Sequence, residues 1–371
     1  MFDDFTDTVL GHHPDFIMGL ANAAATATDP SGSVRLYCPP SYLSGHRLHE
    51  GVGHESVAGG SASSSGVKLP YSRVVDPADL AKACQDAAAH GVTVFLNCYF
   101  DENYPACPGP EAGLRYVHSL HRPGYFAADA AHHLGRYQRL ADFVGERASD
   151  ALVVVNTRVG ERQAAQFVDP RNLLRTGWPT ATRVEVAEWF ERPQLPADHE
   201  PYVLSIGSAR ADKGIQVLLS ALAGGPTVRI LGQQYDGVEA RLRSDHPRTR
   251  VEWETGWISR QRLGEAIAGA AVVVFPYQEE FAVYGGASGA LAQALSVGKP
   301  VIVSEVLADQ VPDSPACQIV PTADEEMLRR AVRVALSNLR ELHEAAADLR
   351  AYVEDNHTYE GHLQRILDRC T

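Results

Sequence analysis

The feature that most constrains the fold is an alternation of short apolar segments with amphipathic ones along most of the 371-residue chain. Apolar runs of this length are typical of buried strands, and the amphipathic segments have the period of helices. Such an alternation predicts α/β architecture with parallel sheets covered by helices. The expected first-half elements are the strands Val34–Cys38, Val92–Asn97, Arg115–Leu120 and Ala151–Asn156 and the helices Asp15–Thr28, Pro77–His90 and Ala127–Ser149.

The length of the chain exceeds what one ordinary core supports, so we expect two domains. Four prolines fall in the charged, weakly periodic stretch from Trp178 to Pro201, which predicts a linker over 179–200 between domains 1–178 and 201–354. After it the alternation restarts. The expected elements are the strands Tyr202–Ile206, Thr227–Leu231, Val272–Pro276 and Pro300–Ser304 and the helices Ile215–Ala223, Val238–Ser244, Gln261–Ala268, Ser288–Val297 and, almost wholly, Glu325–Cys370.

Charge and cysteine content exclude several classes of protein. The net charge of −13 disfavours nucleic acid and anionic membrane surfaces as partners. None of the six cysteines forms a Cys-x-x-Cys pair, which is typical of thiols in a reducing compartment. We see no apolar run long enough to span a bilayer and no signal peptide at the start, so we expect a cytoplasmic protein.

The first motif with chemical content is LSIGSARADKG, from Leu204 to Gly214. A strand leads through a short loop into a helix, and the loop carries Arg210 and Lys213. Two cations beside a helix N-terminus suit a diphosphate, because the free backbone amides there already favour anions. A solvated turn with two surface cations is the alternative interpretation.

The second motif is YGGASGALAQALSVGKPVI, from Tyr284 to Ile302. Small residues precede a helix, which lets a ligand approach the helix amides closely. The helix ends at Gly298, a natural C-cap, and Pro300 begins the next strand. A tight helix–strand packing joint explains the second half of this motif but not its small-residue start.

In this order and strand–helix context, the two motifs resemble the donor-binding half of the family-four retaining glycosyltransferases, glycosyl transferase group 1, which have the GT-B fold. The resemblance covers about Pro201 to Glu305 well and the first half loosely. It implies two Rossmann-like, doubly wound parallel-sheet domains that face each other across a cleft. The first would bind the acceptor and the second a nucleotide-sugar donor, and the last helix, 355–371, would pack back on the first domain.

The resemblance also implies roles for single residues. Arg210 and Lys213 would stabilise the leaving diphosphate, and His121, at the end of an expected strand, would face the transferred sugar. Transfer would proceed with retention and without a metal ion or other cofactor. The remaining donor-binding candidates are Gly207, Ser208, Glu280, Ala287, Ser288, Gly289 and Gln293.

Three positions depart from the family pattern. Ser208 stands where the family has an arginine, so Arg210 would supply that charge. Gln293 replaces the glutamate that binds the nucleotide ribose, and Gly285 stands where the partner glutamate falls. Glu280 takes that place only if Ala282–Gly286 is an insertion. These departures affect the identity of the donor rather than the fold.

The acceptor-side candidates are Gly11, His12 and His13, where the family has a glycine-rich loop after its first strand. Only Met1 to Phe5 is available for that strand. A structural role and a functional role are equally open for His121. For His118, three residues earlier on the opposite face of the expected strand, a structural role is favoured, as is a capped loop for Asp101-Glu102.

One motif is dismissed. The segment from His49 to Glu55 is similar to a zinc-protease helix, but its histidines are five residues apart and two glycines interrupt it. No metal site is therefore expected.

Two functions besides glycosyl transfer stay open. A nucleotide-sugar epimerase shares this architecture, and a catalytically silent binding subunit would explain Gln293 and Gly285. A nicotinamide dehydrogenase is disfavoured because no Gly-x-Gly-x-x-Gly follows a first strand. The acceptor of a transferase would be a small molecule, a lipid or a glycan, and a homo-oligomer is left open.

Overall fold

The protein forms two compact units in a computed structural model. Unit 1 comprises Met1–Gly177, Tyr284–Ala287 and Tyr359–Thr371, and unit 2 comprises Trp178–Val283 and Ser288–Thr358. The residues that the structure describes are 13–27, 34–38, 52–56, 77–98, 113–125, 151–192, 200–207, 209–232, 237–256 and 258–370.

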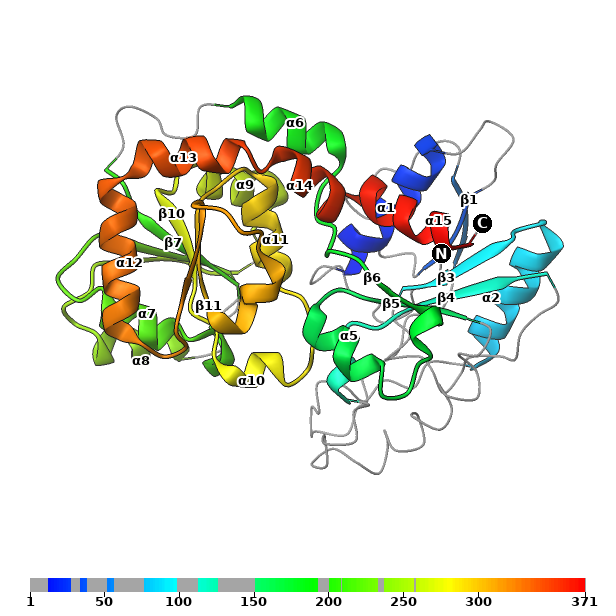
Figure 1. Ribbon diagram of the computed structural model, residues 1–371, viewed down its shortest axis with the longest axis horizontal. Coiled ribbons are helices and arrows are strands. Elements are labelled where there is room, and N and C mark those ends of the chain that lie inside the picture. Colours follow the sequence, from blue (N-terminus) through cyan, green and yellow to red (C-terminus); the bar gives the residue numbers. More distant parts are fainter. Residues whose placement is uncertain are drawn as a thin grey trace. The chain divides into compact units, whose positions relative to one another are not determined.

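Unit 2 is built on a parallel sheet of six strands in the order β9-β8-β7-β10-β11-β12 (Figure 1). Numbered along the chain from the first of them, this order is 3-2-1-4-5-6, that of the doubly wound dinucleotide-binding fold. The prediction of an α/β, Rossmann-like architecture is therefore confirmed here. The strands are β7 (Val203–Ile206), β8 (Val228–Leu231), β9 (Val251–Glu254), β10 (Val272–Phe275), β11 (Val301–Ser304) and β12 (Cys317–Val320).

Both faces of this sheet are buried, because successive side chains along each central strand enter different cores. In β10, Val272 and Val274 belong to one apolar cluster and Val273 and Phe275 to the other. Helices α7, α8 and α12 contribute to the first cluster, and α6, α9, α11 and α14 to the second. The helices of unit 2 are α6 (Arg183–Glu191), α7 (Ile215–Ala221), α8 (Val238–Asp245), α9 (Arg260–Gly269), α10 (Glu279–Ala282), α11 (Gly289–Ser296), α12 (Glu325–Ser337), α13 (Leu339–Ala347) and α14 (Arg350–Asn356).

Helix α6 lies inside the stretch expected to be a linker, so that expectation was wrong over these residues. Thr182 and Glu185 form a capping box, in which each side chain accepts the backbone amide of the other residue. Val186 is fully buried in the α9–α11 core. The prolines that suggested a linker flank the helix and do not interrupt it.

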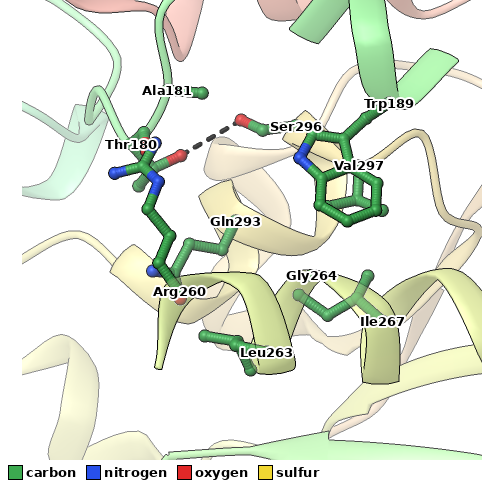
Figure 2. Close-up of a pocket in the computed structure, with 10 residues that line it drawn as sticks. All are labelled: Thr180, Ala181, Trp189, Arg260, Leu263, Gly264, Ile267, Gln293, Ser296 and Val297. Carbon is green, nitrogen blue, oxygen red and sulfur yellow. Dashed lines mark hydrogen bonds between the residues drawn. The ribbon is translucent and has the colours of Figure 1, made fainter. Parts of the chain in front are cut away.

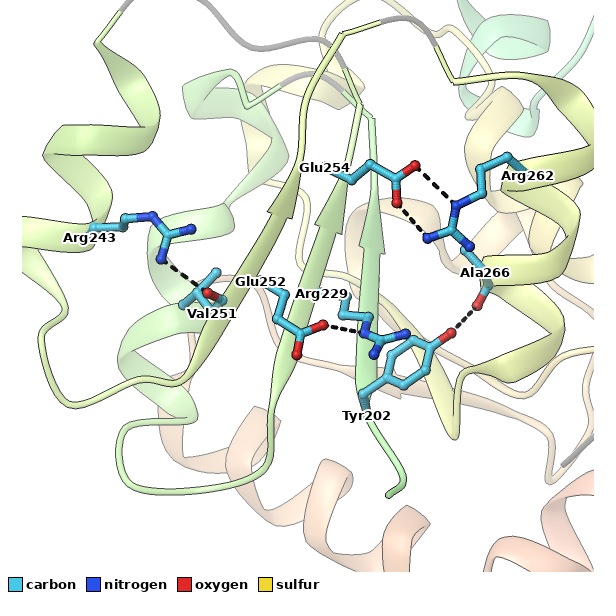
Figure 3. A network of polar contacts seen from close by, with 8 residues as sticks. All are labelled: Tyr202, Arg229, Arg243, Val251, Glu252, Glu254, Arg262 and Ala266. Atoms are coloured by element: carbon cyan, nitrogen blue, oxygen red, sulfur yellow. Dashed lines mark hydrogen bonds and ion pairs between the residues drawn. The ribbon is translucent and has the colours of Figure 1, made fainter. Parts of the chain in front are cut away.

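A chain of polar contacts fastens α9 to the edge of the sheet (Figure 3). The Arg229 guanidinium lies 3.9 Å above the Tyr202 ring and donates to Glu252 at 2.6 Å. The Tyr202 hydroxyl donates to the carbonyl of Ala266 in α9 at 2.6 Å. On β9, the edge strand, the Arg243 guanidinium donates to the Val251 carbonyl at 3.1 Å, and Glu254 pairs with Arg262 of α9 at 2.6 Å.

Unit 1 holds a four-stranded parallel sheet, β3-β4-β5-β6, and a two-stranded parallel sheet, β1-β2. Its expected helix Ala127–Ser149 lies outside the described residues. The strands are β1 (Val34–Cys38), β2 (Val52–Ser56), β3 (Val94–Asn97), β4 (Arg115–Ser119), β5 (Leu152–Val155) and β6 (Leu173–Arg175), and the helices are α1 (His13–Ala27), α2 (Pro77–Ala89), α5 (Arg158–Ala164) and α15 (Tyr359–Cys370).

The last helix, α15, belongs to unit 1, where it packs against α1. A Cβ on Gly19 would lie 2.2 Å from the Tyr359 ring, so only glycine lets the two helices approach this closely. The Arg115 side chain, at the start of β4, donates to the Cys370 carbonyl at 2.7 Å. The helix begins at Tyr359, four residues after the expected start, because α14 runs on to Asn356 in unit 2.

Candidate functional site

The topology of unit 2 places one site above all others, at the carboxyl ends of β7 and β10. Strand order reverses between these two neighbours, and doubly wound sheets bind ligands at that point. The loops that follow the two strands are joined there: the Gln278 amide donates to the Asp212 carbonyl at 2.9 Å. Gly214 makes this possible, because its φ is +63° and a Cβ would lie 1.9 Å from the Pro276 oxygen.

The loop after β7 carries four of the predicted site residues, Gly207, Ser208, Arg210 and Lys213. Gly207 has a φ of +117°, and its amide is bonded to the Leu231 carbonyl of β8. Ser208 lies outside the described residues. Arg210 follows, and its guanidinium donates to both carboxylate oxygens of Asp212, at 2.8 and 2.5 Å. This fork uses two of the five N–H donors of the guanidinium.

Lys213 is held by aromatic rings. Its Nζ lies 3.7 Å from the centre of the Tyr277 ring and 4.1 Å from that of Phe281. Among the residues that the structure describes, no carboxylate forms an ion pair with this ammonium. A cation above ring faces keeps its charge for an anionic ligand, because no counter-ion neutralises it at short range.

Burial and neighbouring charges perturb the pKa values of this cluster. Loss of hydration, and then the charge of Arg210, lower the pKa of Lys213 to about 7, against an opposing effect of Asp212. Burial acts to raise the pKa of Asp212, but hydrogen bonds and charge from Arg210, with the charge of Lys213, hold it below its ordinary value. Near neutral pH, Lys213 is therefore poised between its charged and neutral forms.

The start of α11 is organised by side chains. Ser288 is its N-cap: the hydroxyl accepts from the Leu291 amide at 3.2 Å and lies 3.0 Å from the Tyr277 hydroxyl. The Ser288 amide donates to the Gln310 side chain at 2.8 Å. The expectation that the Ser288 amide points at a ligand was therefore wrong, and its hydroxyl has a structural partner on each side. Gly289, the first helical residue, lies against the Trp178 indole.

The small residues before α11 have a different role from the expected one. Tyr284–Ala287, which includes the predicted site residue Ala287, groups with unit 1. There the Gly285 carbonyl accepts from the Thr157 hydroxyl at 2.6 Å, and a Cβ on Gly286 would lie 2.9 Å from the His121 carbonyl oxygen. Glycines at these positions permit close backbone packing, so the small-residue run is explained without a ligand.

Gln293 lines a pocket between α6, α9 and α11 (Figure 2). Arg260 closes one end, where it donates to the Thr180 carbonyl at 2.6 Å and to Glu185 at 2.8 Å. The cavity measures about 30 Å³, which is room for one or two water molecules and too little for a sugar or base ring. Glu280, the candidate for the family's partner glutamate, is exposed on α10.

His121 in unit 1 lies just beyond the end of β4 and is half-buried. Its Nε2 is 2.7 Å from the Cys98 carbonyl, and its ring packs edge-on against Phe16 with centroids 5.6 Å apart. A carbonyl only accepts, so Nε2 is the donor in this contact. His118, in contrast, is buried within β4, and this burial lowers its pKa to about 3.

Of the remaining predicted residues, the structure describes only a few. Gly11 and His12 lie outside the described residues, as do Asp101 and Glu102; His13 begins α1. His54 lies in strand β2, so the dismissed zinc-protease helix is not formed at that residue. Across the described ranges, no group of three or more His, Cys, Asp or Glu side chains is arranged to hold a metal ion. In the same ranges, every helix falls short of the length and apolar character needed to cross a membrane.

The structure adds residues that sequence reasoning missed. Tyr277, Phe281, Asp212 and Gln310 each contact a predicted site residue. Asp212 could have been found from its position two residues after Arg210. Tyr277 has a weaker signal, its place directly after the Pro276 that ends an apolar strand. Gln310 has none, since its bond to Ser288 spans 22 residues.

Residues 200–338 match the family described as Glycosyl transferases group 1. No curated protein sequence matches the chain. Among solved structures, Anabaena HepE in complex with UDP is similar over 96% of each chain, at 14% identity and a TM-score of 0.64. An α,α-trehalose-phosphate synthase from Burkholderia xenovorans is similar over 95% of each chain, at 12% identity and a TM-score of 0.65.

A third solved structure is also similar in fold. AviGT4, a glycosyltransferase involved in avilamycin A biosynthesis, is similar over 91% of this chain and 84% of its own, at 13% identity and a TM-score of 0.55. At such identities the likeness establishes the fold and not the substrates. The family match covers the β7 and β10 loops that form the site described above. The chain therefore has the GT-B fold, and its residues 200–338 match the glycosyl transferases group 1 family.

Proposed function

We propose that this protein transfers a sugar from a nucleoside-diphosphate sugar to an acceptor hydroxyl, and that unit 2 binds the donor. The observation that carries the proposal is the position of Lys213. Its ammonium lies on aromatic rings at the strand-order reversal of the sheet, within the region that matches the family. Arg210 adds a second cation to the same loop.

The proposed chemistry is electrostatic. The bond between the anomeric carbon and the diphosphate oxygen breaks, and its electron pair leaves with the diphosphate. Arg210 and Lys213 stabilise the charge that develops there, which lowers the barrier because this charge is largest in the transition state. The acceptor oxygen attacks from the face that the diphosphate leaves, so the configuration is retained, and the acceptor proton passes to the departing phosphate oxygen.

The other predicted residues have supporting roles in this proposal. His121 faces the transferred sugar in this proposal, while its Nε2 donates to the Cys98 carbonyl. Gln293 binds the donor ribose as a neutral group, for which the walls of its small pocket must move. Arg210 and Lys213 take the place of a metal ion at the diphosphate in this proposal, so we expect transfer without a metal ion or other cofactor.

Donor binding is tested first, by thermal shift with UDP, GDP and ADP. A nucleotide at about 100 times its dissociation constant should stabilise the protein by roughly 2.7 kcal/mol. Replacement Gln293→Ala should cost roughly 0.5–1.5 kcal/mol of that affinity, the range for a neutral hydrogen bond. An absence of any shift with all three nucleotides would contradict the proposed donor class.

Turnover is tested next, by incubation of the nucleotide sugar that corresponds to the best nucleotide. Slow release of free sugar without acceptor, and transfer with one, support a transferase. Retention is read from the anomeric configuration of the product, and metal independence from activity in excess EDTA. Conversion of the donor sugar into its epimer would instead favour the epimerase, and turnover of neither kind a silent binding subunit.

A further inference from the structure

Tyr277 joins the two parts of the proposed donor site, the loop after β7 and the start of α11. The residue follows β10 after Pro276 and is 2% exposed. Its own backbone is fixed from a third strand, because the Ser304 hydroxyl at the end of β11 donates to the Tyr277 carbonyl at 2.6 Å. One rigidly held side chain therefore lies between the site cations and a helix N-terminus.

The ring of Tyr277 holds Lys213. Its centre is 3.7 Å from Nζ, and the Phe281 ring packs against it at 65° with centroids 4.7 Å apart. The two rings together form the wall on which the ammonium lies. Such a wall restricts the rotamers of a long side chain and removes water from its charge, so it sets both the position and the acidity of the ammonium.

The hydroxyl of Tyr277 holds α11. It lies 3.0 Å from the Ser288 hydroxyl, which in turn accepts the Leu291 amide. Burial raises the pKa of Tyr277 to about 12, despite lowering by the Ser288 hydrogen bond, so the hydroxyl keeps its proton at neutral pH. The capping serine is thus fixed from outside its own helix.

We propose that Tyr277 is the positioning residue for donor binding, whose ring places the Lys213 ammonium and whose hydroxyl fixes the N-terminus of α11 against the same diphosphate. This inference rests on the proposed function and specifies how its site is assembled. Tyr277 acts through Lys213 and Ser288 and touches no reacting atom.

The ring has a measurable consequence. The charged or titratable groups that act on Lys213 are Arg210 and Asp212 on its own loop and Tyr277 across from it. With the pKa of Lys213 lowered to about 7, the ammonium loses its proton as pH rises through that value. Affinity for a diphosphate should therefore be full below pH 7 and fall above it, in a range where a terminal phosphate with a pKa of about 6 is already ionised.

The experiment measures the dissociation constant of UDP by calorimetry from pH 6.5 to 8.5 in wild type, Tyr277→Phe and Tyr277→Leu. Wild-type affinity should fall on the order of tenfold between pH 7 and 8.5. Tyr277→Phe keeps the ring and loses the Ser288 bond, so its affinity should be roughly 2- to 12-fold lower at every pH, with the same fall. Tyr277→Leu removes the ring that packs on Nζ and admits water to the ammonium, so the pKa of Lys213 should rise and the fall in affinity should move to higher pH.

Tyr202→Phe is the matched control. It also deletes a buried tyrosine hydroxyl bond in unit 2, to the Ala266 carbonyl, and it should leave UDP affinity and its pH profile unchanged. An unchanged pH profile in Tyr277→Leu would overturn the role of the ring. Wild-type affinity in Tyr277→Phe would overturn that of the hydroxyl.

A second measurement separates this inference from the proposed function. Reductive ¹³C-methylation keeps the charge of lysines and makes their titration visible by NMR without nucleotide, and Lys213→Arg assigns the Lys213 signal. Titration of Lys213 near pH 7 in wild type and at a higher pH in Tyr277→Leu supports the ring even if UDP, GDP and ADP all fail to bind. If Tyr277→Leu does not fold, Phe281→Leu replaces it and should raise the Lys213 pKa part of the way; titration near pH 10 in wild type overturns the inference.

Discussion

Replacement of Lys213 by alanine should reduce donor affinity and turnover together while leaving the fold intact. A charge-assisted hydrogen bond to phosphate contributes about 1.5–3 kcal/mol, which corresponds to roughly 10- to 150-fold. Part of this energy appears only as the leaving diphosphate gains charge, so turnover should fall as well as affinity. Lys213→Arg should rescue poorly, because a larger, planar guanidinium does not place its charge where the compact ammonium meets the phosphate.

The effect on stability should be small, because two contributions oppose each other. The cation–π contacts are lost, at about 0.5–2 kcal/mol, while the cost of keeping a dehydrated ammonium disappears. The assay pairs UDP calorimetry and donor turnover with denaturant unfolding, and Lys82→Ala, an exposed lysine of α2, is the control. Wild-type UDP affinity in Lys213→Ala would refute the reasoning, as would a loss of binding fully accounted for by unfolding.

Three further predictions concern single positions. His121→Ala should lower turnover strongly while it changes the free energy of unfolding little. If kinetic and denaturation assays show that the loss of turnover is explained by the loss of folded protein, His121 has a structural role only. Gly214→Ala should lower the melting temperature and weaken UDP binding, because its Cβ would lie 1.9 Å from the Pro276 oxygen. Gly224→Ala is the control: its φ of +71° is similar, but no atom lies within 4 Å of the added Cβ, so the free energy of unfolding should fall only by the backbone strain, about 1 kcal/mol. Burial lowers the pKa of Lys299 to about 7 in the fold, so between that value and the ordinary pKa of a lysine the unfolded chain binds one proton more, and the free energy of unfolding rises with pH by up to about 1.4 kcal/mol per unit. Lys299→Met should abolish this rise in denaturant titrations at pH 7 and 9.5. The same rise in wild type and variant would show that the Lys299 amine is charged in the fold.

The central strands could be predicted from the sequence because they are buried on both faces. Val272–Phe275 and Val301–Ser304 are continuous apolar runs, as such strands must be. Cys317–Val320 escaped prediction because it is the edge of its sheet, with Ile319 half exposed, and so lacks that run. Helix α6 escaped because flanking prolines outweighed its capping box.

In the candidate site, residues that are close in sequence could be predicted, and contacts between residues that are distant in sequence could not. Gly207, Arg210 and Lys213 could be proposed because one loop between a strand and a helix carries them. The contacts that set their chemistry could not, because Tyr277 lies 64 residues from Lys213 in sequence and meets it only through the pairing of β7 with β10. Gly285 and Gly286 were interpreted as an approach for a ligand, but they serve close backbone packing, and both roles require glycine.

The place of α15 in unit 1 has a consequence for biosynthesis. The core of that unit needs a helix made some 180 residues after the rest of its sheet. Unit 2 likewise needs α14, whose Val353 is buried in one of its two cores. During translation, both units therefore stay incomplete until late, and α1 lacks the surface that Tyr359 covers until α15 has been synthesised.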